Sequence, residues 1–206
     1  YELKKNGNKR REKRTFRSFS NIKSLDISPD GNYMILSAEW RGKNNLYTYN
    51  YRERKLTQIT NDPFDYRDAT YMPGRERKIL FSSNRPDDTI RVIKSVKEEE
   101  ITNNFNIFLY DPQKPNGFSR LTNTLSKDIM PKALNDREVL YLSDQRGISQ
   151  IYKYDIQDSV SIQLTNYQTS VDHYDIRRDD LFAVMLYKSN EQLIHIKDFD
   201  KDASTF

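Results

Sequence analysis

Hydrophobic and polar residues alternate in short segments along most of this chain. The clearest alternating segments are Asn45–Tyr49, Asn106–Tyr110, Gln150–Tyr154 and Gln192–Ile196. A period of two residues is typical of a β-strand with one buried face, whereas an amphipathic helix would place apolar residues at i, i+3 and i+4. No segment combines the helical period with capping residues. The pattern therefore predicts an all-β chain.

Each alternating segment belongs to a larger unit that recurs. An apolar strand and a polar turn precede it, and a short closing strand ending in Thr-Asn follows it in three of the units. The apolar strands are 33–37, 78–82, 139–143 and, more loosely, 181–186. The closing Thr residues are Thr60, Thr122 and Thr165. The second interval between them, 43 residues, matches the repeat of about 40–45 residues that four-stranded propeller blades give. The first interval, from Thr60 to Thr122, is longer than this repeat. The surplus predicts a charged insertion at residues 87–104.

The turn Ser28-Pro29-Asp30-Gly31 has the residues that a type I turn requires, and it stands just before the first apolar strand. With the Ser-ended strand, the Ile-Tyr strand and the Leu-Thr ending, this unit resembles the repeat of TolB-type, WD40-like β-propellers. The resemblance implies four-stranded antiparallel blades at residues 22–62, 63–124, 125–168 and 169–206, the last one incomplete. A ring of four blades and a part of a larger propeller are both compatible with this count.

The N-terminal segment, residues 1–21, is strongly basic, with eight Lys or Arg residues against two Glu. The rest of the chain is close to neutral, which argues against a nucleic-acid-binding surface. Within this segment, Thr15–Ser20 alternates Phe with polar residues. We predict that it forms an outer strand, either closing a ring with the fourth blade or completing an earlier blade.

The sequence offers little for catalysis, cofactors or metals. Without cysteine there is no disulfide, thiolate site or thiol nucleophile. The two histidines, His173 and His195, are not at metal-ligand spacing, and Gly147–Ile151 lacks the second Gly of a nucleophile elbow. Asp26, Asp30 and Asn32 are explained by turn formation better than by a calcium loop. We therefore expect a protein that is not an enzyme, with no cofactor, no metal and no catalytic residue. No apolar stretch is long enough for direct membrane insertion.

Four residues are candidates for contact with a partner. Arg85 and Arg146 occupy equivalent positions after the Ser of the apolar strand, and Trp40 and Arg41 lie beside the corresponding place in the first unit. One interpretation is a ring of guanidinium groups at one mouth of the propeller that holds a partner's carboxylate. The other, which we favour, is that each Arg bonds carbonyls or an Asp of a neighbouring blade, because repeated residues usually serve the repeat.

For function, the resemblance to TolB-type proteins implies a scaffold in the bacterial periplasm or cell envelope. Its partners would be proteins, such as envelope lipoproteins or peptidoglycan-associated proteins. An alternative from the same resemblance is the gating propeller of a prolyl-oligopeptidase-like serine peptidase, whose catalytic domain is not in this chain. A third interpretation, glycan binding through exposed aromatic residues such as Trp40 and Tyr66, rests on composition alone.

Overall fold

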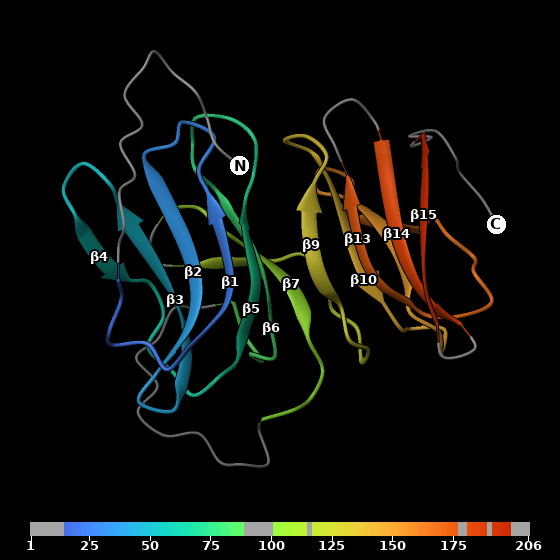
Figure 1. Ribbon diagram of the computed structural model, residues 1–206, viewed down its shortest axis with the longest axis horizontal. Coiled ribbons are helices and arrows are strands. Elements are labelled where there is room, and N and C mark those ends of the chain that lie inside the picture. The colour runs from blue at the N-terminus through green and yellow to red at the C-terminus, as the bar shows by residue number, and fades with distance from the viewer. Residues whose placement is uncertain (1–14, 89–100, 115–116, 177–180, 189–190, 199–206) are drawn as a thin grey trace.

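The computed structural model describes residues 15–88, 101–114, 117–176, 181–188 and 191–198. These residues form fifteen strands, β1 to β15, arranged in four antiparallel sheets (Figure 1). The prediction of an all-β propeller built from antiparallel blades is confirmed. Residues 1–14 of the basic segment and residues 89–100 of the insertion lie outside the described residues.

Each sheet is one blade, and its strands follow one another in chain order. Blade 1 contains β1 (Asn21–Ile27), β2 (Tyr33–Trp40), β3 (Lys43–Asn50) and β4 (Lys55–Gln58). Blade 2 contains β5 (Tyr66–Tyr71), β6 (Ile79–Ser83), β7 (Asn106–Tyr110) and β8 (Phe118–Arg120). Blade 3 contains β9 (Ile129–Ala133), β10 (Glu138–Ser143), β11 (Gln150–Asp155) and β12 (Val160–Gln163). In blade 4 the described strands are β13 (Val171–Ile176), β14 (Leu181–Lys188) and β15 (Glu191–Asp198).

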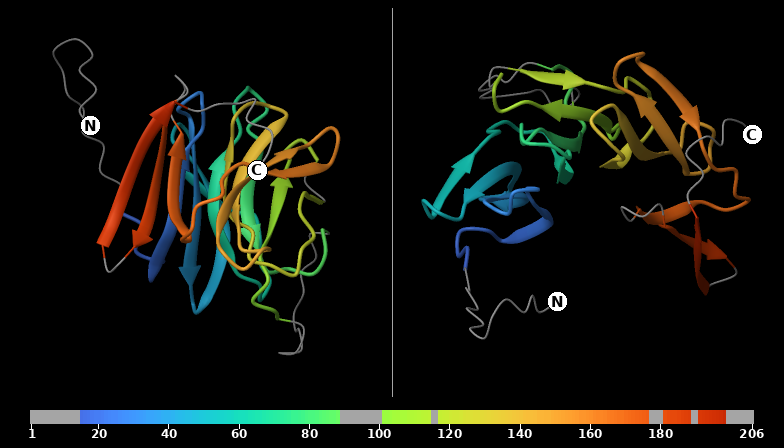
Figure 2. Two further views of the ribbon diagram at one scale, coloured as in Figure 1. Left: turned by 90° about the vertical axis from the view of Figure 1, so that its right-hand side faces the viewer. Right: turned by 90° about the horizontal axis from the view of Figure 1, so that it is seen from above.

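The blades stand side by side in an open arc around a common centre (Figure 2). The first strand of each blade lies innermost, and β1 contacts β5 as β5 contacts β9. The first and last blades flank the gap in the arc and do not pair with each other in the part that the structure describes.

Every interface between blades is an apolar core. Ile35 and Leu46 of blade 1 pack with Phe81 of blade 2, and Phe182 and Val184 of blade 4 join the core of blade 3. Between blades 2 and 3 the core is formed by Met72, Leu80, Ile107, Val139, Tyr141, Tyr152 and Tyr154. A small sheet has two faces to bury, so stacking blades provides what a single blade cannot.

The repeated closing Thr has a structural role. The hydroxyl oxygen of Thr165 accepts the backbone N–H of Ile151 at 2.9 Å and donates to Gln150 Oε1 at 2.9 Å. Thr60 and Thr122 bond the corresponding third strands of blades 1 and 2 in the same way. The Leu-Thr ending therefore fastens the outer edge of a blade to its third strand.

The innermost strands are joined from blade to blade at β-bulges. Ser24 Oγ of blade 1 accepts the N–H of Ala69, and Asp68 Oδ2 of blade 2 accepts the N–H of Met130. The hydroxyl of Tyr174 in blade 4 then donates to the carbonyl of Met130 at 2.6 Å. Asp68 and Met130 have φ of 53° and 55°, in the left-handed region. These bonds use backbone groups that the irregular pairing of the bulges makes available.

The prediction of an outer strand at residues 15–20 is wrong, because the structure has a turn there. Phe16 and Phe19 instead pack on the outer face of blade 1, against Leu36, Ala38 and Tyr47. The ring of Phe19 is 4.7 Å from that of Tyr47, and Phe16 meets Tyr49 edge-on at 5.2 Å. The alternation of Phe with polar residues reflects burial of the two rings, which a turn achieves as well as a strand.

Candidate functional site

The two ends of the blade stack carry different loops. One end, which we call the Trp40 end, carries the connections between the second and third strands of the blades. The other, the Arg77 end, carries the turns at 28–32 and 72–78. Tyr33 is the first residue of β2 and Trp40 is the last. At about 3.3 Å per residue along a strand, the two ends of the stack are roughly 23 Å apart.

Trp40 and Arg41 form an exposed pair at the Trp40 end. The Trp40 side chain is 38% exposed, and the Arg41 guanidinium carbon lies 5.1 Å from the centre of its ring. The chain turns back into β3 through Arg41 and Gly42, with φ of 53° and 75°. This tight turn projects an aromatic ring and a cation into solvent, two groups that are enriched in protein interfaces.

Arg146 is also exposed at this end, in the connection between β10 and β11. The turn that carries it is closed by a bond of 2.8 Å from the Gly147 N–H to the Asp144 carbonyl. Ile148, beside it, is 39% exposed. Blade 3 therefore presents a cation and an apolar side chain at the same end as Trp40.

Arg85 lies in the equivalent connection of blade 2, but its side chain is completely buried. Its Nη1 donates to the Tyr66 hydroxyl at 3.0 Å and lies 3.8 Å from Asp62 Oδ2, while Nε donates to the Asp87 carbonyl. Its guanidinium also covers the ring of Phe118 at 4.5 Å. Of the four candidates, Arg85 therefore does not contribute to an exposed surface; it bonds Tyr66 and Asp87 of its own blade and lies near Asp62 in the connection from blade 1.

The buried charges around Arg85 are balanced. The Tyr66 hydroxyl donates to Asp62 Oδ2 at 2.6 Å. Burial raises the pKa of Asp62, although the Tyr66 bond and the Arg85 charge both act to lower it. Tyr66 itself is fully buried, so the suggestion that it is an exposed glycan-binding aromatic is wrong.

The other polar residues considered from sequence form local bonds. Asp30 accepts the Ser28 hydroxyl and two donors of Asn32 within the turn, and Asp26 accepts the Thr70 hydroxyl of blade 2 at 2.7 Å. His195 is exposed on β15, and its ring is 6.2 Å from that of Tyr167. No group of three or more His, Asp or Glu side chains in the described ranges is arranged to hold a metal ion.

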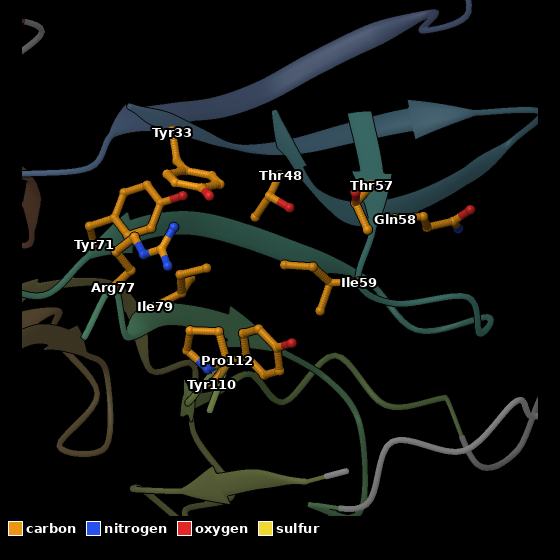
Figure 3. Close-up of a pocket in the computed structure, with 10 residues that line it drawn as sticks. All are labelled: Tyr33, Thr48, Thr57, Gln58, Ile59, Tyr71, Arg77, Ile79, Tyr110 and Pro112. Carbon is orange, nitrogen blue, oxygen red and sulfur yellow. The ribbon is translucent and has the colours of Figure 1, made fainter. Parts of the chain in front are cut away.

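A cavity of about 450 Å³ opens between blades 1 and 2 at the Arg77 end (Figure 3). Its lining includes Tyr33 and Thr48 of blade 1, Tyr71 and Tyr110 of blade 2, and Arg77 from the turn between β5 and β6. The sequence does not predict this cavity, because its lining residues come from distant positions with no shared motif or spacing.

Solved structures identify the architecture. TolB from Acinetobacter baumannii superposes with a TM-score of 0.68 over 90% of this chain and 42% of its own, at 19% sequence identity. The chain has the fold of a TolB-type β-propeller. It spans less than half the length of that TolB.

The same TolB-like arrangement of blades also occurs in enzymes. Puromycin hydrolase matches with a TM-score of 0.65 over 88% of this chain and 27% of its own, at 11% identity. A structure from a study of two prolyl endopeptidases matches with a TM-score of 0.59 over 90% of this chain and 28% of its own, also at 11% identity. No protein-family model and no curated protein sequence matches the chain. The similarity therefore establishes the fold, which occurs in TolB and in hydrolases alike.

The structure contains no helix of the length and apolarity needed to cross a membrane within the residues it describes.

Proposed function

We propose that this TolB-like propeller is a non-catalytic scaffold that binds other proteins in the bacterial cell envelope. The observation that carries the proposal is the exposed Trp40–Arg41 pair at the same end of the stack as Arg146 and Ile148. Aromatic and Arg side chains dominate binding energy in protein interfaces, and blades locked by apolar cores hold them in place. The similarity to TolB supports the envelope and suggests lipoproteins or peptidoglycan-associated proteins as partners.

The test compares envelope proteins captured by the wild-type chain and by the double variant Trp40→Ala, Arg146→Ala. We expect specific partners to be recovered by the wild type and lost from the variant, with an unchanged melting temperature. The control is Arg75→Ala, which removes an exposed charge at the opposite end. Equal capture by all three proteins would contradict the proposed surface.

A second candidate function is the gating propeller of a prolyl-oligopeptidase-like serine peptidase. The match to a prolyl endopeptidase structure supports it. The two functions differ in what is encoded after residue 206, because a peptidase requires a hydrolase domain with a Gly-x-Ser-x-Gly motif. Sequencing the coding region downstream of Phe206 distinguishes them.

A further inference from the structure

The cavity between blades 1 and 2 contains a guanidinium group that makes no ion pair within the described residues, although its charge acts on the nearby Asp30 carboxylate and helps to lower the pKa of that group. Arg77 is half-buried, and its guanidinium carbon lies 4.1 Å from the centre of the Tyr33 ring. No carboxylate among the described residues is within ion-pair distance of it. The neighbouring Glu76 is ion-paired with Lys78, with 2.5 Å between Lys78 Nζ and Glu76 Oε2. The Tyr33 ring occupies one face of the guanidinium and leaves its N–H donors available.

Two other arginines of the protein, in contrast, are ion-paired. Arg85 is paired with Asp62 and Asp87, and Arg137 with Asp155 and Asp158. The backbone of Arg77 is in the left-handed region, with φ of 55°, and its guanidinium lines the cavity beside the Tyr33 ring. The cation is thus fixed in a partly enclosed space, where its interactions are screened less than at an open surface.

Hydroxyl groups lie beside this cation. The Tyr71 side chain is only 8% exposed, and its hydroxyl points toward Tyr33 and Arg77 (Figure 3). Burial raises the pKa of Tyr71, which keeps the hydroxyl protonated and able to donate. Thr48 and Thr57 on the opposite wall add two more hydroxyls. Within the described residues, none of these three hydroxyls makes a hydrogen bond to protein.

The remaining walls are apolar and suit a peptide. Ile59, Ile79, Tyr110 and Pro112 also line the cavity, with Ile79 beside Arg77 and Ile59 farther away (Figure 3). A volume of about 450 Å³ lies within the range of sites that enclose small ligands or a few side chains. Aromatic and aliphatic walls around one cation fit an anionic side chain flanked by apolar residues.

We propose that this cavity is a binding site for an acidic peptide segment, whose carboxylate is held by Arg77 and by the Tyr71 hydroxyl. A carboxylate matches the fork of N–H donors on a guanidinium, and such charge-assisted bonds are stronger than neutral ones. The site is independent of the proposed partner surface, because it lies at the other end of the blades.

The test uses two pools of labelled pentapeptides that differ only in the central residue, Glu in one and Gln in the other. Fluorescence anisotropy with the wild-type chain should show about tenfold tighter binding of the Glu pool, the factor expected from charge-assisted hydrogen bonds. Arg77→Met should abolish this preference, and Tyr71→Phe should reduce it. The control, Arg75→Met, removes an exposed charge of the same loop and should keep it.

Three results would overturn the site: equal binding of the two pools, equal loss in Arg75→Met and Arg77→Met, or equally tight binding of free N-acetylglutamate or galacturonate. The last outcome would assign the cation to small carboxylates or acidic sugars. If Arg77→Met does not fold, the proposal is tested by NMR titration of the wild-type protein. Addition of the Glu pool must then shift the resonance of the Arg77 Nε–H group. The variant Trp40→Ala, Arg146→Ala should bind the Glu pool as the wild type does. A negative result for the proposed partner surface therefore does not contradict the peptide site, and the reverse also holds.

Discussion

Equivalent residues in this repeat have different roles because their partners differ. In the sequence, Arg85 and Arg146 each stand three positions after a Ser of the second strand, Ser82 in β6 and Ser143 in β10. The position that supplies Asp62 to Arg85 is occupied by Thr124 in the next repeat. There the buried carboxylate is Asp128, which is satisfied by the hydroxyls of Ser143 and Thr124 at 2.6 and 2.9 Å. Because Thr124 replaces the carboxylate that would pair with it, Arg146 has no buried counter-charge in blade 3. Its side chain is exposed to solvent.

This difference predicts unequal effects of removing the two arginines. Arg85→Met should lower the free energy of unfolding by about 3–5 kcal/mol, because it leaves the buried Asp62 without its counter-charge. Arg146→Met should change it by less than about 0.5 kcal/mol, as is usual at the surface. Urea unfolding followed by circular dichroism measures both. Similar small losses in the two variants would mean that the Arg85 network contributes little.

The pH dependence of the Arg85→Met variant follows from Asp62. Burial already holds the pKa of Asp62 above its ordinary value of 3.8, and loss of the Arg85 charge would raise it further. A raised pKa means that the folded state binds more protons than the unfolded state just above pH 3.8, so stability falls as the pH rises through this window. The deficit of Arg85→Met should therefore be largest near pH 7 and shrink toward pH 4. A deficit that is constant over this range would contradict the assignment to Asp62.

At the scale of elements, three kinds of contact stabilise the blades. Stacked apolar faces and hydrogen bonds at the bulges of the innermost strands join neighbouring blades, whereas each closing Thr of blades 1 to 3 fastens the edge of its own blade. The turn at residues 15–20 adds a fourth contact, specific to blade 1, by covering a face that has no neighbouring blade in the described arc.

Removal of that cover should destabilise blade 1. Deleting residues 1–20 exposes Leu36 and Tyr47, and we expect the melting temperature to fall by roughly 5 °C from the loss of two half-buried rings. Deleting only residues 1–14 keeps Phe16 and Phe19 and should leave the melting temperature close to that of the wild type. Equal melting curves for the wild type and the longer deletion would contradict the role of the two rings.

For the whole molecule, the arc places blades 2 and 3 between neighbours on both sides, while blades 1 and 4 have one neighbouring blade each. The stability of stacked repeats depends on contacts between adjacent units, so the ends of the stack should open more easily. The exposure of Ile194 and Ile196 on β15, at 67% and 65%, is consistent with a face that no other blade covers.

Hydrogen exchange measured by mass spectrometry should show this gradient. We expect the slowest exchange in the central strands of blades 2 and 3, which are β6, β7, β10 and β11, and the fastest among the strands in β4 and β15. Uniform exchange in all blades would indicate that the arc opens as a single cooperative unit.

The sequence by itself determined the strands, the order of the repeats and the all-β propeller, because alternation of side chains and turn chemistry are properties of neighbouring residues. It also placed Trp40, Arg41 and Arg146 in or beside short polar turns, where the structure has them exposed. Tertiary structure alone decided that Arg85 and Tyr66 are buried, that Phe16 and Phe19 cover a face without forming a strand, and that Arg77 stands in a cavity between two blades. The reason is physical: burial and charge pairing depend on which side chains of adjacent blades meet, and Asp62 reaches Arg85, or Tyr33 reaches Arg77, only after the blades have stacked.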